Sequence, residues 1–256
     1  MLQQSTVYGP VKSWRLGRSL GIDLLCVDSI CSFACVYCQL GKINQLTRKR
    51  AVYVETERVM ADLGRSDWQS ADVVTFSGSG EPTLAANLGD VISGVKELTG
   101  KPVVILTNST MLGSAGVREQ VAGADKIFCK LDAWNDDVLR RVDRPAAGIT
   151  LRSIVSGIRR LRKEFAGFLA IQTMILHQMS DADIEALGRI LLSIRPDEVQ
   201  LNLPTRPIPR DFIPESRGNE LVAGKNARVL KTLDRSALEE IRNRLEAITG
   251  LPIITR

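Results

Sequence analysis

Residues 31–38 read Cys31-Ser-Phe-Ala-Cys35-Val-Tyr-Cys38, and this stretch decides how the rest of the chain is interpreted. It follows an apolar run, Leu20–Leu25, that predicts a buried β-strand. The 256 residues include only five cysteines, so three of them in one short loop indicate that the spacing is selected. A chain of this size does not need disulfide cross-links, which favours metal binding or catalysis.

Outward from this stretch, apolar runs alternate with amphipathic stretches. The predicted strands are Leu20–Leu25, Asp72–Phe76, Val103–Leu106, Lys126–Lys130, Phe168–Leu176 and Glu198–Leu203. The predicted helices between and after them are Glu55–Gln69, Leu88–Leu98, Ala115–Val121, Asp136–Arg141, Leu151–Glu164, Asp181–Ile194 and Arg235–Ile248. Repeated alternation predicts a parallel sheet with right-handed crossovers. Six units are too few for an eight-unit barrel, so we expect an α/β fold, a partial (β/α)6 barrel with an open parallel sheet and outer helices.

Nothing in the composition marks a domain boundary, so residues 1–256 are expected to form one domain. Residues 1–25 would hold the N-terminal segment and first strand, and residues 204–256 the C-terminal loop and helices, with prolines concentrated in 203–214. A hydrophobic content of 44% with 25% charged residues is typical of a globular protein. No apolar run is long enough for a membrane helix and the start lacks a signal-peptide pattern, so we expect a cytoplasmic protein without a membrane partner.

Two further counts exclude classes of function. His177 is the only histidine, which excludes mechanisms that need two. The net charge of +5 is spread along the chain and fits a solvated surface better than a nucleic-acid footprint.

The cysteine spacing leaves three interpretations open. Offsets of four and seven place three thiols on one face of a helix, where cysteine can serve as a small core residue. A zinc site would need a fourth ligand from Cys26, Cys129 or His177. A [4Fe–4S] cluster is ordinarily held by four cysteines, so three would leave one iron open to a ligand.

The pattern Cys-x-x-x-Cys-x-x-Cys, with the aromatic Tyr37 before the last cysteine, resembles the signature of radical S-adenosylmethionine (SAM) enzymes. The resemblance implies a partial TIM-type barrel, a [4Fe–4S] cluster on Cys31, Cys35 and Cys38, and SAM bound at the open iron. It also implies an oxidoreductase chemistry: one electron from a donor such as flavodoxin or ferredoxin breaks a sulfur–carbon bond of SAM. The 5′-deoxyadenosyl radical that forms then abstracts a hydrogen atom from the substrate.

A second signal follows the second strand, where small residues let the backbone approach a ligand and a carboxylate can accept from an ammonium group. It resembles the family's Gly-Gly-Glu element, which binds the amino group of SAM, although a serine replaces the first glycine. The candidate cofactor-binding residues here are Ser77, Gly78, Ser79, Gly80 and Glu81.

Polar residues at the ends of the later strands are the remaining candidates, because ligands collect at the carboxyl ends of parallel strands. Lys130 and Asp132 face the same way and form either an ion pair or part of the SAM site; Lys130 is also a candidate catalytic residue for a substrate imine. The other cofactor-binding candidates are Tyr37, Asn108, Gln172, Asn202 and Arg206. The alternative role of Gln172 is to satisfy backbone groups, and the alternative for Arg206 is a place in an exposed proline-rich connection.

Five segments narrow the resemblance to Fe–S oxidoreductases related to tRNA-wyosine synthase: residues 8–23, 77–84, 130–133, 143–145 and 203–207. Wyosine synthases carry a second cluster on additional cysteines, whereas only Cys26 and Cys129 remain here. We therefore do not carry over pyruvate and tRNA as substrates, and tRNA stays an open alternative as a partner.

We thus expect a single-cluster radical SAM enzyme acting on a small molecule or nucleoside. One alternative is an activating enzyme that generates a glycyl radical on a partner protein. The other is a zinc- or cluster-binding protein without turnover. Cys26, which closes the first predicted strand, is a further catalytic candidate, with buried packing as its alternative role.

Overall fold

An eight-stranded sheet forms the centre of the computed structural model, which describes residues 4–213, 217 and 226–255. The strand order is β1-β2-β5-β6-β7-β8-β9-β12. Its six central strands are those that the sequence predicts, and all of them run parallel: β2 (Gly17–Ile22), β5 (Val73–Phe76), β6 (Val103–Thr107), β7 (Lys126–Lys130), β8 (Phe168–Met174) and β9 (Glu198–Asn202). The predicted α/β fold with an open, mostly parallel sheet is confirmed.

Two edge strands were not predicted. β1 (Val7–Ser13) pairs antiparallel with β2, and β12 (Ile253–Thr255) pairs parallel with β9. The first predicted strand also ends earlier, at Ile22, because Asp23 turns the chain and its carboxylate accepts from the backbone N–H of Leu25 at 2.9 Å.

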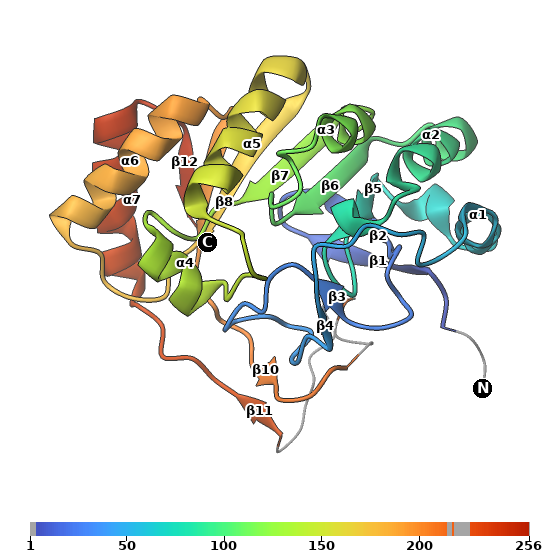
Figure 1. The fold of residues 1–256 in the computed structure, drawn as a ribbon, viewed down its shortest axis with the longest axis horizontal. Helices are drawn as coiled ribbons and strands as arrows, with labels where there is room; N and C mark the ends of the chain where they lie inside the picture. The colour runs from blue at the N-terminus through green and yellow to red at the C-terminus, as the bar shows by residue number, and fades with distance from the viewer. Residues whose placement is uncertain (1–3, 214–216, 218–225, 256) are drawn as a thin grey trace.

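The helices lie on one side of this sheet, where Figure 1 shows α1, α2, α3, α5, α6 and α7 in an arc. Their bounds are α1 (Thr56–Gly64), α2 (Leu88–Thr99), α3 (Ala115–Val121), α4 (Asp136–Val142), α5 (Leu151–Glu164), α6 (Asp181–Ile194) and α7 (Arg235–Thr249). Capping boxes begin α5 at Thr150 and α6 at Ser180, which is why the sequence located both starts. The first predicted helix extends too far: the chain leaves α1 after Gly64 and makes a separate 3-10 turn, η1 (Trp68–Ser70).

The core lies between the sheet and the helices, and alternate residues of each strand supply it. In β5, Val74 and Phe76 face the helices, whereas Val73 belongs to a smaller apolar cluster with Val104 and Phe128 on the other side. Full burial of side chains such as these contributes roughly 1.5–3 kcal/mol each, so the central strands form a rigid support.

Short strand pairs and loops lie on the side of the sheet away from the helix arc (Figure 1). β3 (Ile30–Cys31) pairs with β4 (Gln45–Leu46), and β10 (Ile208–Pro209) pairs with β11 (Ala227–Arg228). The loop that contains the three cysteines begins in β3. Of the proline-rich stretch 203–214, the last residue lies outside the described part of the chain.

Candidate functional site

The cysteine loop is held between two segments from distant parts of the sequence. On one side, Ile30 forms a parallel β-bridge with Gly80 of the glycine-rich loop that follows β5. On the other side, Phe33 forms an antiparallel bridge with Pro145, and the backbone N–H of Ala34 donates to the carbonyl of Asp143 at 2.9 Å. Backbone pairing on both sides fixes the course of the loop without using its thiols.

All three thiols of the loop are free. Burial raises the pKa of Cys31, Cys35 and Cys38, and the charge of Cys38 further raises the pKa of the other two, so the sulfurs lie close enough to act on one another. The Cys35 thiol donates to Asp143 Oδ1 at 3.4 Å. Asn108 Nδ2 lies 3.5 Å from the sulfur of Cys31.

These donors fit an iron–sulfur cluster in number and kind. Neighbouring buried thiols are costly to ionise, and binding to iron would replace their protons with metal, which stabilises the thiolates. Three such donors leave one iron of a [4Fe–4S] cubane without a protein ligand. In the described part of the chain, no three His, Cys, Asp or Glu side chains are placed to hold a single metal ion.

Tyr37, Lys130 and Asp132 form one contact network beside the loop. The Tyr37 hydroxyl donates to Asp132 Oδ2, and Lys130 Nζ lies 3.4 Å from the same oxygen. Lys130 Nζ also lies 4.8 Å from the centre of the Tyr37 ring. The other oxygen of Asp132 accepts from the backbone N–H of Met174 at 2.6 Å. The predicted same-side placement of Lys130 and Asp132 is what the structure has, and the lysine keeps 25% of its side chain exposed.

Asp143 is a member of this region that sequence reasoning used only as part of a family resemblance. Its side chain is buried, and among the described residues its Oδ2 has no hydrogen-bond partner. Burial, followed by the nearby charge of Asp132, raises the pKa of Asp143 well above its usual range. A carboxyl group whose ionised form is disfavoured thus lies beside Cys35.

The glycine-rich loop packs against the start of the cysteine loop. A Cβ at Gly80 would lie 1.6 Å from the carbonyl oxygen of Ile30, so only glycine permits this approach. Ser79 is anchored by Asp23, whose Oδ2 accepts from the Ser79 backbone N–H at 3.0 Å and from its hydroxyl at 2.7 Å. The hydroxyl of Ser77 pairs with that of Tyr8 at 2.7 Å. The side chains of Ser77 and Ser79 are therefore engaged in contacts within the protein.

Glu81 is buried, and the protein itself occupies its carboxylate. Oε1 accepts from the backbone N–H of Thr83 at 3.1 Å, from the Thr83 hydroxyl at 2.5 Å and from the Thr107 hydroxyl at 2.6 Å. Oε2 accepts from the backbone N–H of Asn108 at 2.6 Å. Because Asn108 in turn donates to Ser32 at 2.8 Å, Glu81 ties the glycine-rich loop to the end of β6 and to the cysteine loop.

Farther along the sheet, the polar candidates form a continuous row on β8 and β9. Gln172 Nε2 donates to Gln200 Oε1 at 2.9 Å. Arg15, from the turn between β1 and β2, donates to Gln200 at 3.2 Å and to Asn202 Oδ1 at 3.5 Å. Sequence reasoning missed Arg15 and did not single out Gln200, because only the curvature of the sheet brings the first hairpin to β9.

Several candidates lie elsewhere. Arg58 lies 4.0 Å from the sulfur of Cys26, and burial raises the pKa of that thiol. Cys129 belongs to the apolar core, where burial raises its pKa to about 12. His177 is exposed and packs on the Trp134 ring at 5.8 Å. Arg206 is half-buried and engaged in an interaction.

A mostly parallel α/β sheet with a three-cysteine loop after its first parallel strand defines one class of protein. The family model described as the Radical SAM superfamily matches residues 27–191. The chain belongs to the radical SAM superfamily.

Particular relatives narrow this further. The chain is 44% identical to the UPF0026 protein slr1464 of Synechocystis sp. over 96% of its own length and 94% of that protein. Its fold is similar to that of TYW1 with a lysine-pyruvate adduct bound, with a TM-score of 0.62, 15% identity, and coverage of 91% of this chain and 75% of that one. It is also similar to Streptococcus suis SuiB bound to S-adenosylmethionine, with a TM-score of 0.59, 14% identity and 90% coverage, although the chain spans only 45% of SuiB.

Membership of this superfamily implies an iron–sulfur cluster and SAM, as expected from the cysteine spacing. The superfamily consists of enzymes that act on varied substrates and need a reductant. No helix among residues 4–213, 217 and 226–255 has the length and apolar character to cross a bilayer.

Proposed function

We propose that this chain is an enzyme that holds a [4Fe–4S] cluster on Cys31, Cys35 and Cys38 and cleaves SAM reductively, so that a 5′-deoxyadenosyl radical removes a hydrogen atom from a small-molecule or nucleoside substrate. The observation that carries the proposal is the loop of three free, half-buried cysteines whose thiols lie close to one another, held by backbone bridges on both sides. When bound, the cluster supplies the electron that breaks the sulfur–carbon bond.

The residues around the loop hold it in place. Tyr37 covers one side, with its hydroxyl fixed by Asp132. Asn108 reaches the loop from the end of β6 and donates to both Ser32 and Cys31. Preorganised donors of this kind stabilise charge on thiolate sulfur without having to rearrange.

The backbone of residues 77–80 and the side chain of Lys130 are the proposed contacts for the polar end of SAM. Support comes from the positions of the two groups: the small residues of the loop let it pack directly against the cysteine loop, and the Lys130 ammonium stays partly exposed beside that loop. Glu81 serves as a positioning residue, because its four protein donors leave the carboxylate engaged. Gln172, Asn202 and Arg206 remain predictions as cofactor contacts.

The lysine-pyruvate adduct bound in the TYW1 structure raises a second role for Lys130, as an imine-forming residue. The contacts of Lys130 favour the anion contact, because its ammonium lies against the carboxylate of Asp132 and over the Tyr37 ring. Incubation with pyruvate and borohydride followed by mass spectrometry should leave Lys130 unmodified; a reduced adduct on Lys130 would establish the imine role instead.

The test of the proposed function is formation of 5′-deoxyadenosine from SAM. The protein is reconstituted anaerobically with iron and sulfide, reduced with dithionite, and its products are separated by chromatography. Wild type should release 5′-deoxyadenosine and methionine, Cys38→Ala should release neither, and Cys129→Ala should remain active because its thiol lies in the core. Equal cleavage by Cys38→Ala would show that the loop thiols do not hold the reactive centre.

Lys130→Met separates SAM binding from cluster binding. Loss of one charge-assisted contact of about 1.5–3 kcal/mol should raise the SAM Kd roughly 10- to 100-fold while the iron content stays unchanged. Equilibrium dialysis with labelled SAM measures the first and a colorimetric assay the second. An unchanged Kd would remove Lys130 from the proposed contacts. Cys26→Ala should retain SAM cleavage; loss of substrate turnover alone would give Cys26 a catalytic role.

A further inference from the structure

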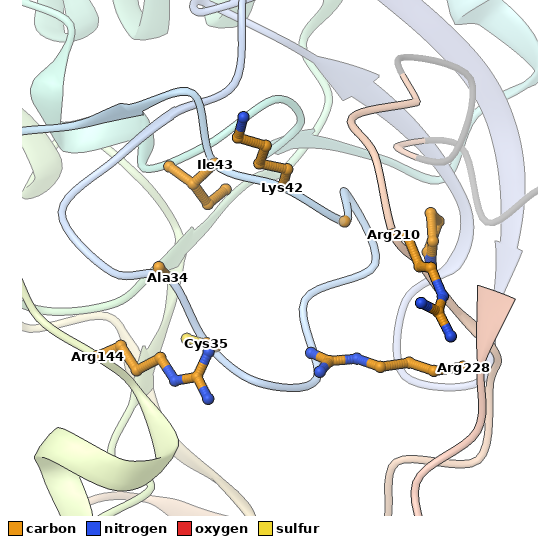
Figure 2. A pocket seen from close by; sticks show the side chains of 9 residues that line it. Ala34, Cys35, Lys42, Ile43, Arg144, Arg210 and Arg228 are labelled. Carbon is orange, nitrogen blue, oxygen red and sulfur yellow. The ribbon is translucent and has the colours of Figure 1, made fainter. Parts of the chain in front are cut away.

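A basic pocket lies against the cysteine loop. It has a volume of about 570 Å³ (Figure 2). Its walls come from the middle of the loop, from the residues just after it, from the turn after α4 and from the region of the β10–β11 pair. The lining residues are Ala34, Cys35, Gly41, Lys42, Ile43, Arg144, Pro209, Arg210 and Arg228.

Close backbone packing builds this pocket. Gly41 has φ 78°, and a Cβ there would lie 2.2 Å from the carbonyl oxygen of Asp211. The Ile213 backbone N–H donates to the carbonyl of Leu40 at 3.3 Å, and Arg228 donates to the carbonyl of Val36 at 2.6 Å. The C-terminal segment is thus fastened directly to the cysteine loop, with the pocket between them.

Among the described residues, the lining of the pocket is positively charged. Of the nine lining residues, four are basic and none is acidic. In the described part of the chain, Lys42, Arg144, Arg210 and Arg228 take part in no ion pair, and all four are exposed. Two acidic residues adjoin these side chains in sequence: Asp211 accepts from Asn226 at 2.9 Å, and Asp143 accepts from the Cys35 thiol at 3.4 Å. A concentration of like charge around a hollow attracts an anionic surface and speeds its association.

The position of the pocket selects the kind of anion. Cys35 lines it, so a group docked there lies against a proposed cluster ligand (Figure 2). Substrate and SAM, in contrast, belong on the side of the glycine-rich loop and Lys130, whose residues do not line the pocket. Reductive SAM cleavage requires one electron from outside, and a donor protein with negative surface around its redox group would complement this positive hollow.

We infer, on the basis of the proposed function, that this basic pocket is the docking site of an acidic one-electron donor protein of the flavodoxin type. The donor's reduced flavin is oxidised by one electron and the cluster is reduced by one electron. No bond is made or broken in the pocket itself. The four basic side chains orient the donor so that its flavin faces Cys35.

The test compares two pairs of charge reversals. Lys42→Glu/Arg210→Glu changes the pocket. The matched control Arg159→Glu/Lys163→Glu makes the same change of charge in a second basic hollow, on α5. Binding of oxidised flavodoxin to the full-length protein is measured by NMR titration, and electron transfer from reduced flavodoxin by stopped-flow absorbance. The rate with dithionite, which needs no docking site, serves as the reference.

The inference predicts that the pocket variant raises the flavodoxin Kd by about tenfold or more and lowers the ratio of flavodoxin-driven to dithionite-driven reduction similarly. The control pair should stay within about twofold, and the difference should shrink at 0.5 M salt, where the Debye length falls to a few ångströms. Equal losses in both pairs, or no loss in the pocket variant, would overturn the inference.

Three further outcomes are informative. If the pocket variant loses binding to a short RNA duplex but keeps flavodoxin binding, the pocket serves a nucleic acid and the inference is wrong. If wild type binds flavodoxin through the pocket but dithionite yields no SAM cleavage, the docking site stands and the proposed function fails. If SAM cleavage occurs but flavodoxin does not bind at the pocket, the proposed function stands and the docking inference is wrong.

Discussion

Replacement of Gly80 by alanine tests whether the glycine-rich loop and the cysteine loop act as one structural unit. The new Cβ would lie 1.6 Å from the Ile30 carbonyl oxygen and 2.5 Å from its carbonyl carbon. Because these are backbone atoms, no side-chain rotation relieves the clash, and the two segments must separate by about 1.4 Å to reach a 3.0 Å contact.

The separation removes two backbone hydrogen bonds: Ile30 N–H to Ser79 at 2.9 Å and Glu81 N–H to Ile30 at 3.1 Å. Leaving buried backbone groups unpaired costs about 1–3 kcal/mol each, so Gly80→Ala should lower the free energy of unfolding by about 2–6 kcal/mol. A domain is stable by only about 5–15 kcal/mol, so the loss is large. We expect the urea midpoint to fall by roughly 1–2 M.

Urea denaturation followed by circular dichroism measures this effect, and iron content after reconstitution shows whether the cysteine loop is displaced. The matched control is Gly116→Ala in α3, where an added Cβ meets nothing within 4 Å. That variant should gain about 0.5–1 kcal/mol from helix propensity and keep its iron. If Gly80→Ala loses less than about 1 kcal/mol and binds iron normally, the reasoning on the coupled loops is refuted.

Two other changes give sharp expectations. Although burial alone raises the pKa of Asp62, hydrogen bonds from Thr6 and Arg65 lower it overall. The Asp62 carboxylate therefore stabilises the fold at neutral pH. This contribution disappears as the pH falls below about 4. Asp62→Asn should therefore cost about 1–2 kcal/mol at pH 7 and almost nothing near pH 2.5, which urea midpoints at both pH values measure; an equal loss at both would contradict the assignment. Tyr37→Phe removes the donor to the buried Asp132 and should cost about 1–3 kcal/mol in the same assay, whereas a loss below about 0.5 kcal/mol would mean that the bond contributes little.

The sequence carried most of the fold because local signals and tertiary structure agree in this chain. α5 and α6 have the predicted bounds, since each begins at a capping residue that can be recognised locally. β7 also has the predicted bounds, because a short apolar run ends at Lys130. β1 escaped prediction because it lies at an edge, is interrupted by Gly9 and Pro10, and depends on pairing with β2.

The site was predictable where residues are close in sequence and not where the fold assembles it. The spacing of the cysteines and the strand-end pair Lys130 and Asp132 could be found directly. Arg15 could not, because its contact with Gln200 joins positions 185 residues apart. Arg217 was missed for the same reason: it forms a 2.9 Å ion pair with Asp23 from the opposite end of the chain.

The position of Glu81 after a strand could be predicted from the sequence, but its hydrogen-bond partners could not. Its place after a strand and a run of small residues predicted a contact with an ammonium group. In the structure, its carboxylate is surrounded by Thr83, Thr107 and Asn108, which the sequence places 26 or more residues away in two of the three cases. The motif therefore predicted where Glu81 lies, whereas its hydrogen-bond partners favour a positioning role.

Metal content and spectroscopy of the reconstituted protein test the central claim most directly. After anaerobic loading with iron and sulfide, wild type should hold about four irons per chain and show a paramagnetic signal on reduction with dithionite, while Cys35→Ala should lose both. A wild-type protein without iron, or a Cys35→Ala variant with the same iron content and the same signal, would contradict the assignment of the cluster to this loop.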